Sequence, residues 1–174
     1  SMGTDSLRLS RTMTLTALFA AMITLTTAYF FHIPVGTGGG YIHLGDAFIY
    51  LAASFLPTPY ACAAACLGGS LADLLSGSLL WMVPTALIKP LTVLCFTARG
   101  NRLLCTRNLL ALPAAGIITM GGYYLAEVLL FGSWSAPLVS LGANLIQAVG
   151  SSLVYLLMAL ALDGVHLKSR LRFL

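Results

Sequence analysis

Residues 141–163, LGANLIQAVGSSLVYLLMALALD, form an apolar run in which the first charged residue is the final aspartate. A helix rises 1.5 Å per residue, so a run of this length covers the roughly 30 Å hydrocarbon core of a bilayer. Soluble domains carry charge on about a quarter of their residues, whereas this chain of 174 residues is only 8% charged and 59% hydrophobic. Its mean hydropathy is +0.93. The sequence therefore predicts an integral membrane protein.

Five further apolar runs precede this one, separated by glycine, proline and charged residues. Together they predict an all-α fold of six transmembrane helices at residues 10–32, 45–57, 59–77, 84–99, 109–131 and 141–163. Residues 1–9 are expected to form a tag remnant and a cytoplasmic N-terminus. Residues 10–163 are expected to form a single transmembrane domain, and residues 164–174 a basic cytoplasmic tail.

The basic residues predict the orientation of the chain. Of nine Lys and Arg residues, eight lie at or before the start of the first run, after the sixth, or from the end of the fourth run to the start of the fifth. With an even number of spans these three segments lie on one side, and the excess of basic residues in cytoplasmic loops makes that side cytoplasmic. Both termini are therefore predicted to be cytoplasmic. The net charge of +4 then reflects orientation, and no nucleic-acid partner is expected.

A second group of polar residues falls near the opposite, outer ends of the runs. An ionisable group inside a membrane span is costly and usually faces a partner or a polar cavity. Aromatic and amide side chains occur at the same level. We therefore predict an outward-facing pocket formed by Tyr41, His43, Asp46, Asp73, Trp81, Lys89, Tyr123, Glu127, Asn144 and Gln147.

Structural explanations of the same residues remain open. His43 and Asp46 could cap the second helix, whose N-terminus favours negative charge. Lys89 could form an ion pair with Asp73 or Glu127, or contact the ligand directly. The amides could form hydrogen bonds between helices, and the tryptophans could belong to an interfacial aromatic belt. The presence of so many polar groups at one depth in the membrane favours a ligand pocket over these structural explanations.

Two small-residue patterns indicate where other molecules would approach. In the segment GGGYIHLGDA at residues 38–47, Gly38, Gly39 and Gly40 give the backbone freedom of a flexible loop that can close over a ligand. In the first run, Ala17 and Ala21 form a small-xxx-small pattern that allows another helix to come close.

The segments HLGDA at residues 43–47 and GGSLADLLSG at residues 68–77, with the alanine-rich first run and the glycine-rich loop, resemble the substrate-binding S components of energy-coupling factor (ECF) transporters. The resemblance covers nearly the whole chain. It implies a multi-pass protein of the bacterial plasma membrane that binds a vitamin-like micronutrient with high affinity, with the glycine loop as a lid.

The same resemblance implies partners. An S component associates with a transmembrane coupling protein, here through Ala17 and Ala21, and with two cytoplasmic ATPase subunits. The chain contains no Gly-x-x-x-x-Gly-Lys-Ser/Thr phosphate loop. The sequence therefore predicts a transport subunit rather than an enzyme, with ATP hydrolysed by the partners.

The outer residues also bear on the ligand. Three carboxylates against one lysine favour a cationic ligand or one rich in N–H donors, because ionised carboxylates only accept hydrogen bonds. The aromatic side chains favour a flat ring. A 7-deazaguanine base, meaning a queuosine precursor or queuine, fits both demands and is assigned to related small S components. Thiamine or its precursor ranks second, and riboflavin third.

The sequence also allows two other classes of protein. A secondary transporter that works alone is the alternative, although such proteins show inverted repeats and broken helices at the midplane. Gly121–Gly122 is the only candidate break in the sequence. A membrane enzyme would need a nucleophile or a metal constellation, and no spaced set of His and carboxylate ligands occurs. Neither a metal nor a cofactor is expected.

Overall fold

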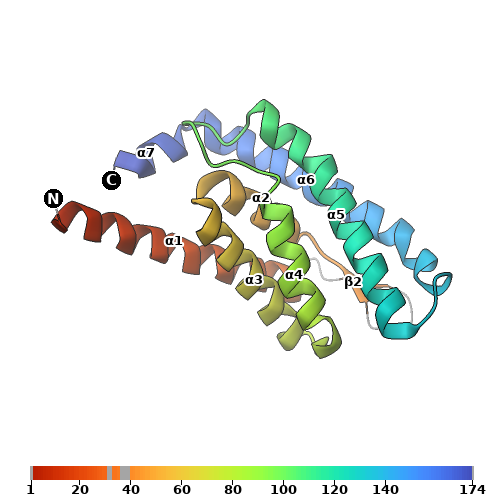
Figure 1. Ribbon diagram of the computed structural model, residues 1–174. Coiled ribbons are helices and arrows are strands. Elements are labelled where there is room, and N and C mark those ends of the chain that lie inside the picture. The colour runs from red at the N-terminus through yellow and green to blue at the C-terminus, as the bar shows by residue number, and fades with distance from the viewer. Residues whose placement is uncertain (1, 31–32, 36–39, 174) are drawn as a thin grey trace.

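The computed structural model describes residues 2–30, 33–35 and 40–173 (Figure 1). Helices account for nearly all of this part of the chain. They are α1 (Met2–Ala28), α2 (Gly45–Phe55), α3 (Thr58–Leu75), α4 (Met82–Val93), α5 (Thr106–Phe131), α6 (Leu141–Gly164) and α7 (Leu167–Phe173), with short 3₁₀ helices η1 (Leu79–Trp81) and η2 (Ala136–Ser140). Two short strands, β1 (Ile33–Val35) and β2 (Gly40–Ile42), pair antiparallel.

Each of the six predicted runs overlaps one of the helices α1 to α6, but the helix boundaries differ from the prediction. By length and composition, the segments Met2–Ala28, Thr106–Phe131 and Ala136–Gly164 are long and apolar enough to cross a membrane. The 11 residues of α2 extend only about 16 Å at 1.5 Å per residue. Pro90 lies inside α4; proline lacks the N–H that continues a helix, and α4 ends at Val93 rather than at residue 99.

Two elements were not predicted. In the region expected to form a flexible loop, the β1–β2 hairpin places Ile33 opposite Ile42 and Val35 opposite Gly40. The basic tail contains α7, which packs against α6. The fold is therefore all-α apart from one small hairpin, in place of the wholly helical fold that we expected.

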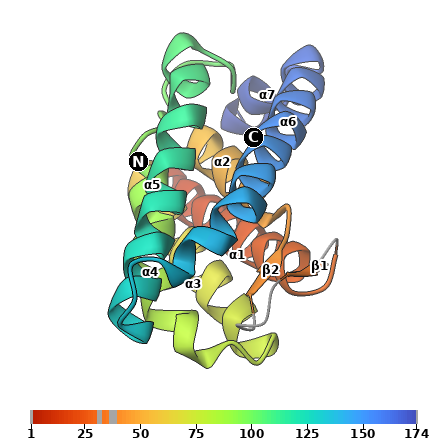
Figure 2. The same cartoon turned by 90° about the vertical axis from the view of Figure 1, so that its right-hand side faces the viewer.

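The short helix α2 lies at the centre of the molecule. It packs against α1, α3, α4 and α6 (Figures 1 and 2), and nine of its 11 residues are buried. Because an element surrounded in this way contacts little lipid or water, any charge it carries must find a partner inside the protein. This position determines the environment of Asp46.

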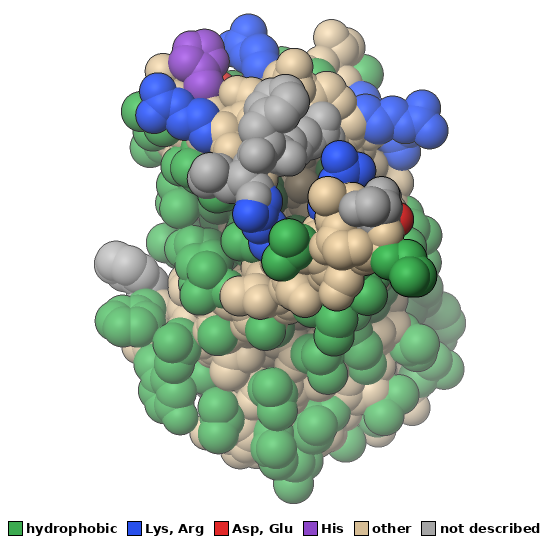
Figure 3. All heavy atoms as spheres, turned by 90° about the vertical axis from the view of Figure 1, so that its left-hand side faces the viewer, with side chains coloured by type: hydrophobic (Ala, Val, Ile, Leu, Met, Phe, Trp, Pro, Cys, Tyr) green, Lys and Arg blue, Asp and Glu red, His purple; other side chains and the backbone are tan. Residues whose placement is uncertain are grey.

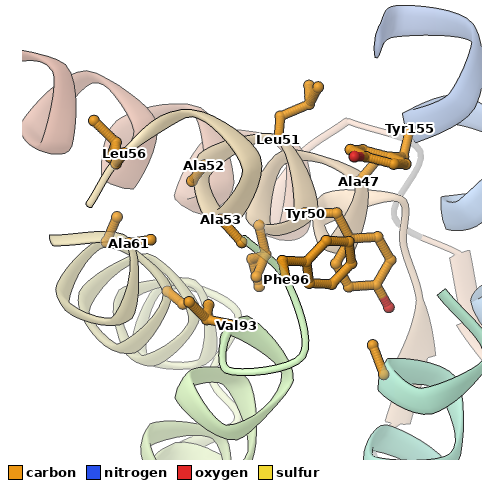
Figure 4. Close-up of a cluster of buried hydrophobic side chains, with 14 of the residues drawn as sticks. Ala47, Tyr50, Leu51, Ala52, Ala53, Leu56, Ala61, Val93, Phe96 and Tyr155 are labelled. Carbon is orange, nitrogen blue, oxygen red and sulfur yellow. The ribbon is translucent and has the colours of Figure 1, made fainter. Parts of the chain in front are cut away.

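Aromatic packing fixes α2 against the helices beside it. The Tyr50 ring stacks on the Phe96 ring at 4.9 Å between centroids, and both rings meet the edge of Tyr155 from α6 (Figure 4). The Tyr155 hydroxyl lies 2.7 Å from Ser54 Oγ, so its polar end is also satisfied. Edge-to-face and stacked pairs of this kind add stability beyond the area they bury.

Gly68 and Gly69, in the GGSLADLLSG segment, allow α3 to approach two neighbours closely. A Cβ atom on Gly68 would lie 2.8 Å from Ile23 Cβ on α1, and one on Gly69 would lie 2.7 Å from Thr85 Cγ2 on α4. Consecutive helical positions point about 100° apart, so the two glycines serve different contacts. Part of this sequence signal therefore reflects helix packing rather than ligand contact.

Candidate functional site

A buried ion pair joins α2 to α4. Asp46, in the first turn of α2, is 2% exposed, and Lys89 of α4 is 3% exposed. Lys89 Nζ lies 2.7 Å from Asp46 Oδ1 and donates a hydrogen bond to it. Asp46 also lies in the first turn of α2, where negative charge suits the helix N-terminus, so the ion pair and the N-terminal role of Asp46 are compatible. The pairing of Lys89 with Asp46 was not among the partners that the sequence suggested.

His43 and Gln147 adjoin this pair. The His43 backbone N–H donates to Gln147 Oε1 on α6 at 3.2 Å, while His43 Nδ1 accepts the Gly45 N–H at 3.0 Å. His43 thus accepts a hydrogen bond from the first backbone amide of α2. This contact agrees with the alternative in which His43 caps the helix. Gln147 is buried and also interacts with the Asp46 carboxylate. An amide and an imidazole thus complete the buried polar group.

Tyr123 brings α5 to the same place. Lys89 Nζ lies 5.3 Å from the centre of the Tyr123 ring, a cation–π distance. The Tyr123 hydroxyl forms a 2.8 Å hydrogen bond with Thr85 Oγ1 on α4, and the Trp81 ring lies 6.1 Å from the Tyr123 ring. Sequence reasoning missed Thr85, although its i, i+4 spacing from Lys89 places both on one helical face.

We call Asp46, Lys89, His43, Gln147 and Tyr123 the outer cluster. Its members come from α2, α4, α5 and α6 and from the segment between β2 and α2. It offers donors, acceptors and an aromatic face side by side. These are the groups that recognise the edges and the plane of a heterocycle.

Three other predicted residues lie around the outer cluster rather than within its hydrogen bonds. Asp73 is buried near the end of α3 and interacts electrostatically with Tyr123. Glu127 is half-buried one turn beyond Tyr123 and forms no ion pair or side-chain hydrogen bond with any described residue. Asn144 is half-buried one turn before Gln147 on α6.

Part of the predicted lid and pocket falls outside the described residues. This applies to Gly38, Gly39 and the side chain of Tyr41. Gly40 begins β2. The lid assignment therefore remains a prediction.

The predicted docking pair lies on the outside of the molecule. Ala17 and Ala21 are exposed on α1, whereas Ala20 and Ala28 on another face of the helix are buried. The two kinds of alanine thus separate by helical face: one set packs within the chain, and the other is open to a partner.

The sequence did not predict that one further carboxylate is buried. Asp163, at the end of α6, accepts hydrogen bonds from the backbone N–H groups of Leu103 and Leu104 at 2.7 and 3.0 Å, with Arg102 Nε at 3.9 Å. It holds the connection between α4 and α5. The available signal was an acidic residue at the end of the last apolar run, on the basic side of the chain. Among the described residues no group of three or more His, Cys, Asp and Glu side chains could hold a metal.

A protein-family model, the ECF-type riboflavin transporter S component, matches residues 9–163. The match includes all six predicted runs and the whole outer cluster. The chain belongs to this family. Membership confirms the resemblance to S components and implies a transport subunit associated with ECF transmembrane and ATPase modules, not an enzyme. No curated protein sequence matches the chain.

Proposed function

We propose that this S component binds a flat micronutrient heterocycle at the outer cluster and passes it to its ECF partners. The buried Asp46–Lys89 pair carries the proposal. Burying two charges removes their hydration, so such a pair contributes little net stability compared with well-packed apolar residues. Its position beside an amide and an aromatic ring is better explained by recognition of a ligand. The alternative of a secondary transporter that works without partners is no longer favoured, because S components work with ECF partners.

Riboflavin becomes the first ligand to test. The name of the matching family points to it, and one argument against it has weakened. Because Lys89 neutralises Asp46, the carboxylate excess that favoured a cationic or donor-rich ligand is smaller than the sequence suggested. A neutral isoalloxazine ring, with carbonyl and N–H edges, suits a paired acid and base. A 7-deazaguanine base ranks second and thiamine or its precursor third.

The proposal places the chain in the bacterial plasma membrane with both termini in the cytoplasm. Successive helices α1 to α6 run back and forth between two ends of the molecule (Figure 1). Arg8, Arg11, Arg99 and Lys168 meet at the end where the termini lie. Cytoplasmic segments of membrane proteins are enriched in such residues, so this arrangement supports an outward-facing position for the outer cluster.

Titration of the purified chain tests the ligand. Flavin fluorescence should be quenched on binding, and mass spectrometry of small molecules released from gently purified protein should show which ligand copurifies. A preparation that binds neither flavins, 7-deazaguanines nor thiamine would contradict the proposed ligand class. Cellular uptake that does not require the ATPase partners would contradict the assigned mode of transport.

Glu127→Gln tests one peripheral residue. If Glu127 contacts the ligand, removing its charge should weaken binding by about 2–5 kcal/mol, the usual effect of deleting one partner of a buried charged contact. The matched control is Asp5→Asn, a change of the same kind at an exposed position of α1. Affinity equal to that of the control, in a normally folded variant, would remove Glu127 from the site.

We also propose that Ala17 and Ala21 form the docking face for the coupling protein. Their exposure and i, i+4 spacing support close helix approach. Ala17→Trp and Ala21→Trp should overpack that contact by about 1–3 kcal/mol, equivalent to a roughly 5- to 150-fold loss of complex affinity. Leu157→Trp, on an exposed face of α6, is the control. Equal complex formation by all three variants would place the docking face elsewhere.

A further inference from the structure

A cavity of about 590 Å³ opens at the end of the molecule opposite the outer cluster. Its walls come from the N-terminal half of α1, the turn between α2 and α3, residues 97–99 and α7. Figure 3 looks onto this face, where Lys and Arg side chains gather. The outer cluster uses none of these residues, so the cavity needs an explanation of its own.

Four cationic side chains line the cavity. Arg8 and Arg11 lie one turn apart on α1, Arg99 follows α4, and Lys168 belongs to α7. No carboxylate is among the lining residues. Arg8, Arg11 and Arg99 form no ion pair with a carboxylate of the described chain. The three arginines therefore bring positive charge to the cavity that no carboxylate of the described residues pairs with.

The wall that carries Arg99 is held in place. Lys168 is 2% exposed, and its Nζ donates to the Ala98 carbonyl at 2.6 Å. Asn108 binds Thr97 twice, accepting from its N–H at 2.8 Å and donating to its carbonyl at 3.0 Å. A site supported in this way is preorganised, so little ordering opposes binding of an anion.

The remaining walls are largely apolar. Leu15, Phe55, Leu56 and Leu171 face the same cavity as the arginines. Leu15 lies seven residues after Arg8 and thus on the same face of α1. A ligand that fits must therefore be amphipathic, with an anionic group near the chain termini and an apolar part directed toward the helices.

We propose that this cavity binds the phosphodiester headgroup of an anionic phospholipid. Arginine recognises phosphate oxygens through paired hydrogen bonds, and basic residues beside the cytoplasmic leaflet attract anionic lipids. The apolar walls receive the first carbons of the acyl chains. Inorganic phosphate would satisfy the arginines but would leave those walls unused, so the lipid is the better fit.

Native mass spectrometry of the full chain, titrated with phosphatidylglycerol, tests the proposal. Phosphatidylcholine, whose headgroup carries no net charge, is the comparison lipid. At about 1 kcal/mol for each basic residue near the membrane surface, Arg8→Gln, Arg11→Gln and Arg99→Gln should each weaken phosphatidylglycerol binding about fivefold. The triple variant should weaken it about 100-fold if these contributions add.

Arg170→Gln is the matched control, because Arg170 is an exposed α7 residue that does not line the cavity. Phosphatidylglycerol affinity in this variant should stay within about twofold of the wild type, as expected for a surface substitution. Equal binding of the two lipids, or losses in the control as large as those in Arg11→Gln, would overturn the proposal. Displacement of phosphatidylglycerol by excess inorganic phosphate would identify a free-anion site instead and would also overturn it.

Discussion

Two buried carboxylates at opposite ends of this S component have different kinds of partner. Asp46 is 2% exposed and faces the ammonium group of Lys89. Asp163 is 8% exposed and accepts two backbone N–H groups of the α4–α5 connection. Both charges are satisfied, but Asp46 is hydrogen-bonded to a side chain with rotatable bonds, whereas both hydrogen bonds of Asp163 come from the backbone and the exposed Arg102 side chain lies 3.9 Å away. A bound ligand can redirect a side chain, whereas backbone amides are fixed by the fold.

In our proposal the two carboxylates therefore have different roles: Asp46 takes part in binding the ligand, and Asp163 holds the fold. Asp163 holds a loop in one shape, and replacing its hydrogen bonds with those of a ligand would release that loop. In our proposal Asp46 and Lys89 exchange their mutual contact for contacts with a ligand while the surrounding helices stay packed. Burial alone does not distinguish these two roles, so the proposal rests on the nature of the partner.

The largest expected effect comes from breaking the outer pair. Lys89→Met leaves Asp46 buried without its cation, and removing one partner of a buried ion pair costs about 3–5 kcal/mol. Denaturant unfolding in detergent should show this loss of stability, together with a loss of ligand affinity. Leu87→Met, at an exposed position on the same helix, is the control. Wild-type stability in Lys89→Met would mean that Asp46 has another sufficient partner.

A smaller effect is expected at the other end. In Asp163→Asn the side-chain NH₂ group cannot accept the second backbone N–H, and hydrogen bonds to charged groups contribute about 1.5–3 kcal/mol. Unfolding should be easier by this amount, while the folded protein should keep its ligand affinity. Asp5→Asn should change neither quantity. A lower ligand affinity in Asp163→Asn would show that the two ends of the molecule are coupled. It would contradict the assignment of a purely structural role to Asp163.

The smallest net effect on stability is expected when both charges of the outer pair are removed. Replacing a buried ion pair with uncharged groups is often nearly neutral, so Asp46→Asn combined with Lys89→Met should recover to within about 1 kcal/mol of the wild type. Ligand binding should remain lost, as isothermal titration would show. Recovery of both stability and binding would reduce the pair to a structural role.

Much of the fold was predictable because the chain alternates apolar runs with short polar breaks. Each of the six runs overlaps a helix, but hydropathy could not show that α2 is a central helix of 11 residues. It also could not predict the end of α4, which follows Pro90, or the hairpin, whose strands have three residues each. Such short elements produce too little periodicity to stand out from the flanking sequence.

The outer cluster was predictable as a set of residue types at one depth, but its pairings were not. Lys89 and Asp46 are 43 positions apart, and their contact depends on how α2 and α4 cross. Thr85 and Asp163 were missed for different reasons. Threonine is common in membrane helices, and nothing in the sequence indicates that Asp163 accepts hydrogen bonds from a backbone segment about 60 positions earlier.

The short length of α2 has a consequence for how the chain enters the membrane during synthesis. An 11-residue helix is about half as long as the hydrocarbon core requires, and α2 carries Asp46 in its first turn. It is therefore a poor substrate for independent insertion. Only Leu56 and Pro57 separate it from α3, so we expect α2 and α3 to be inserted together as a helical hairpin. The contacts of α2 with α6 then form only after the last long helix has been made.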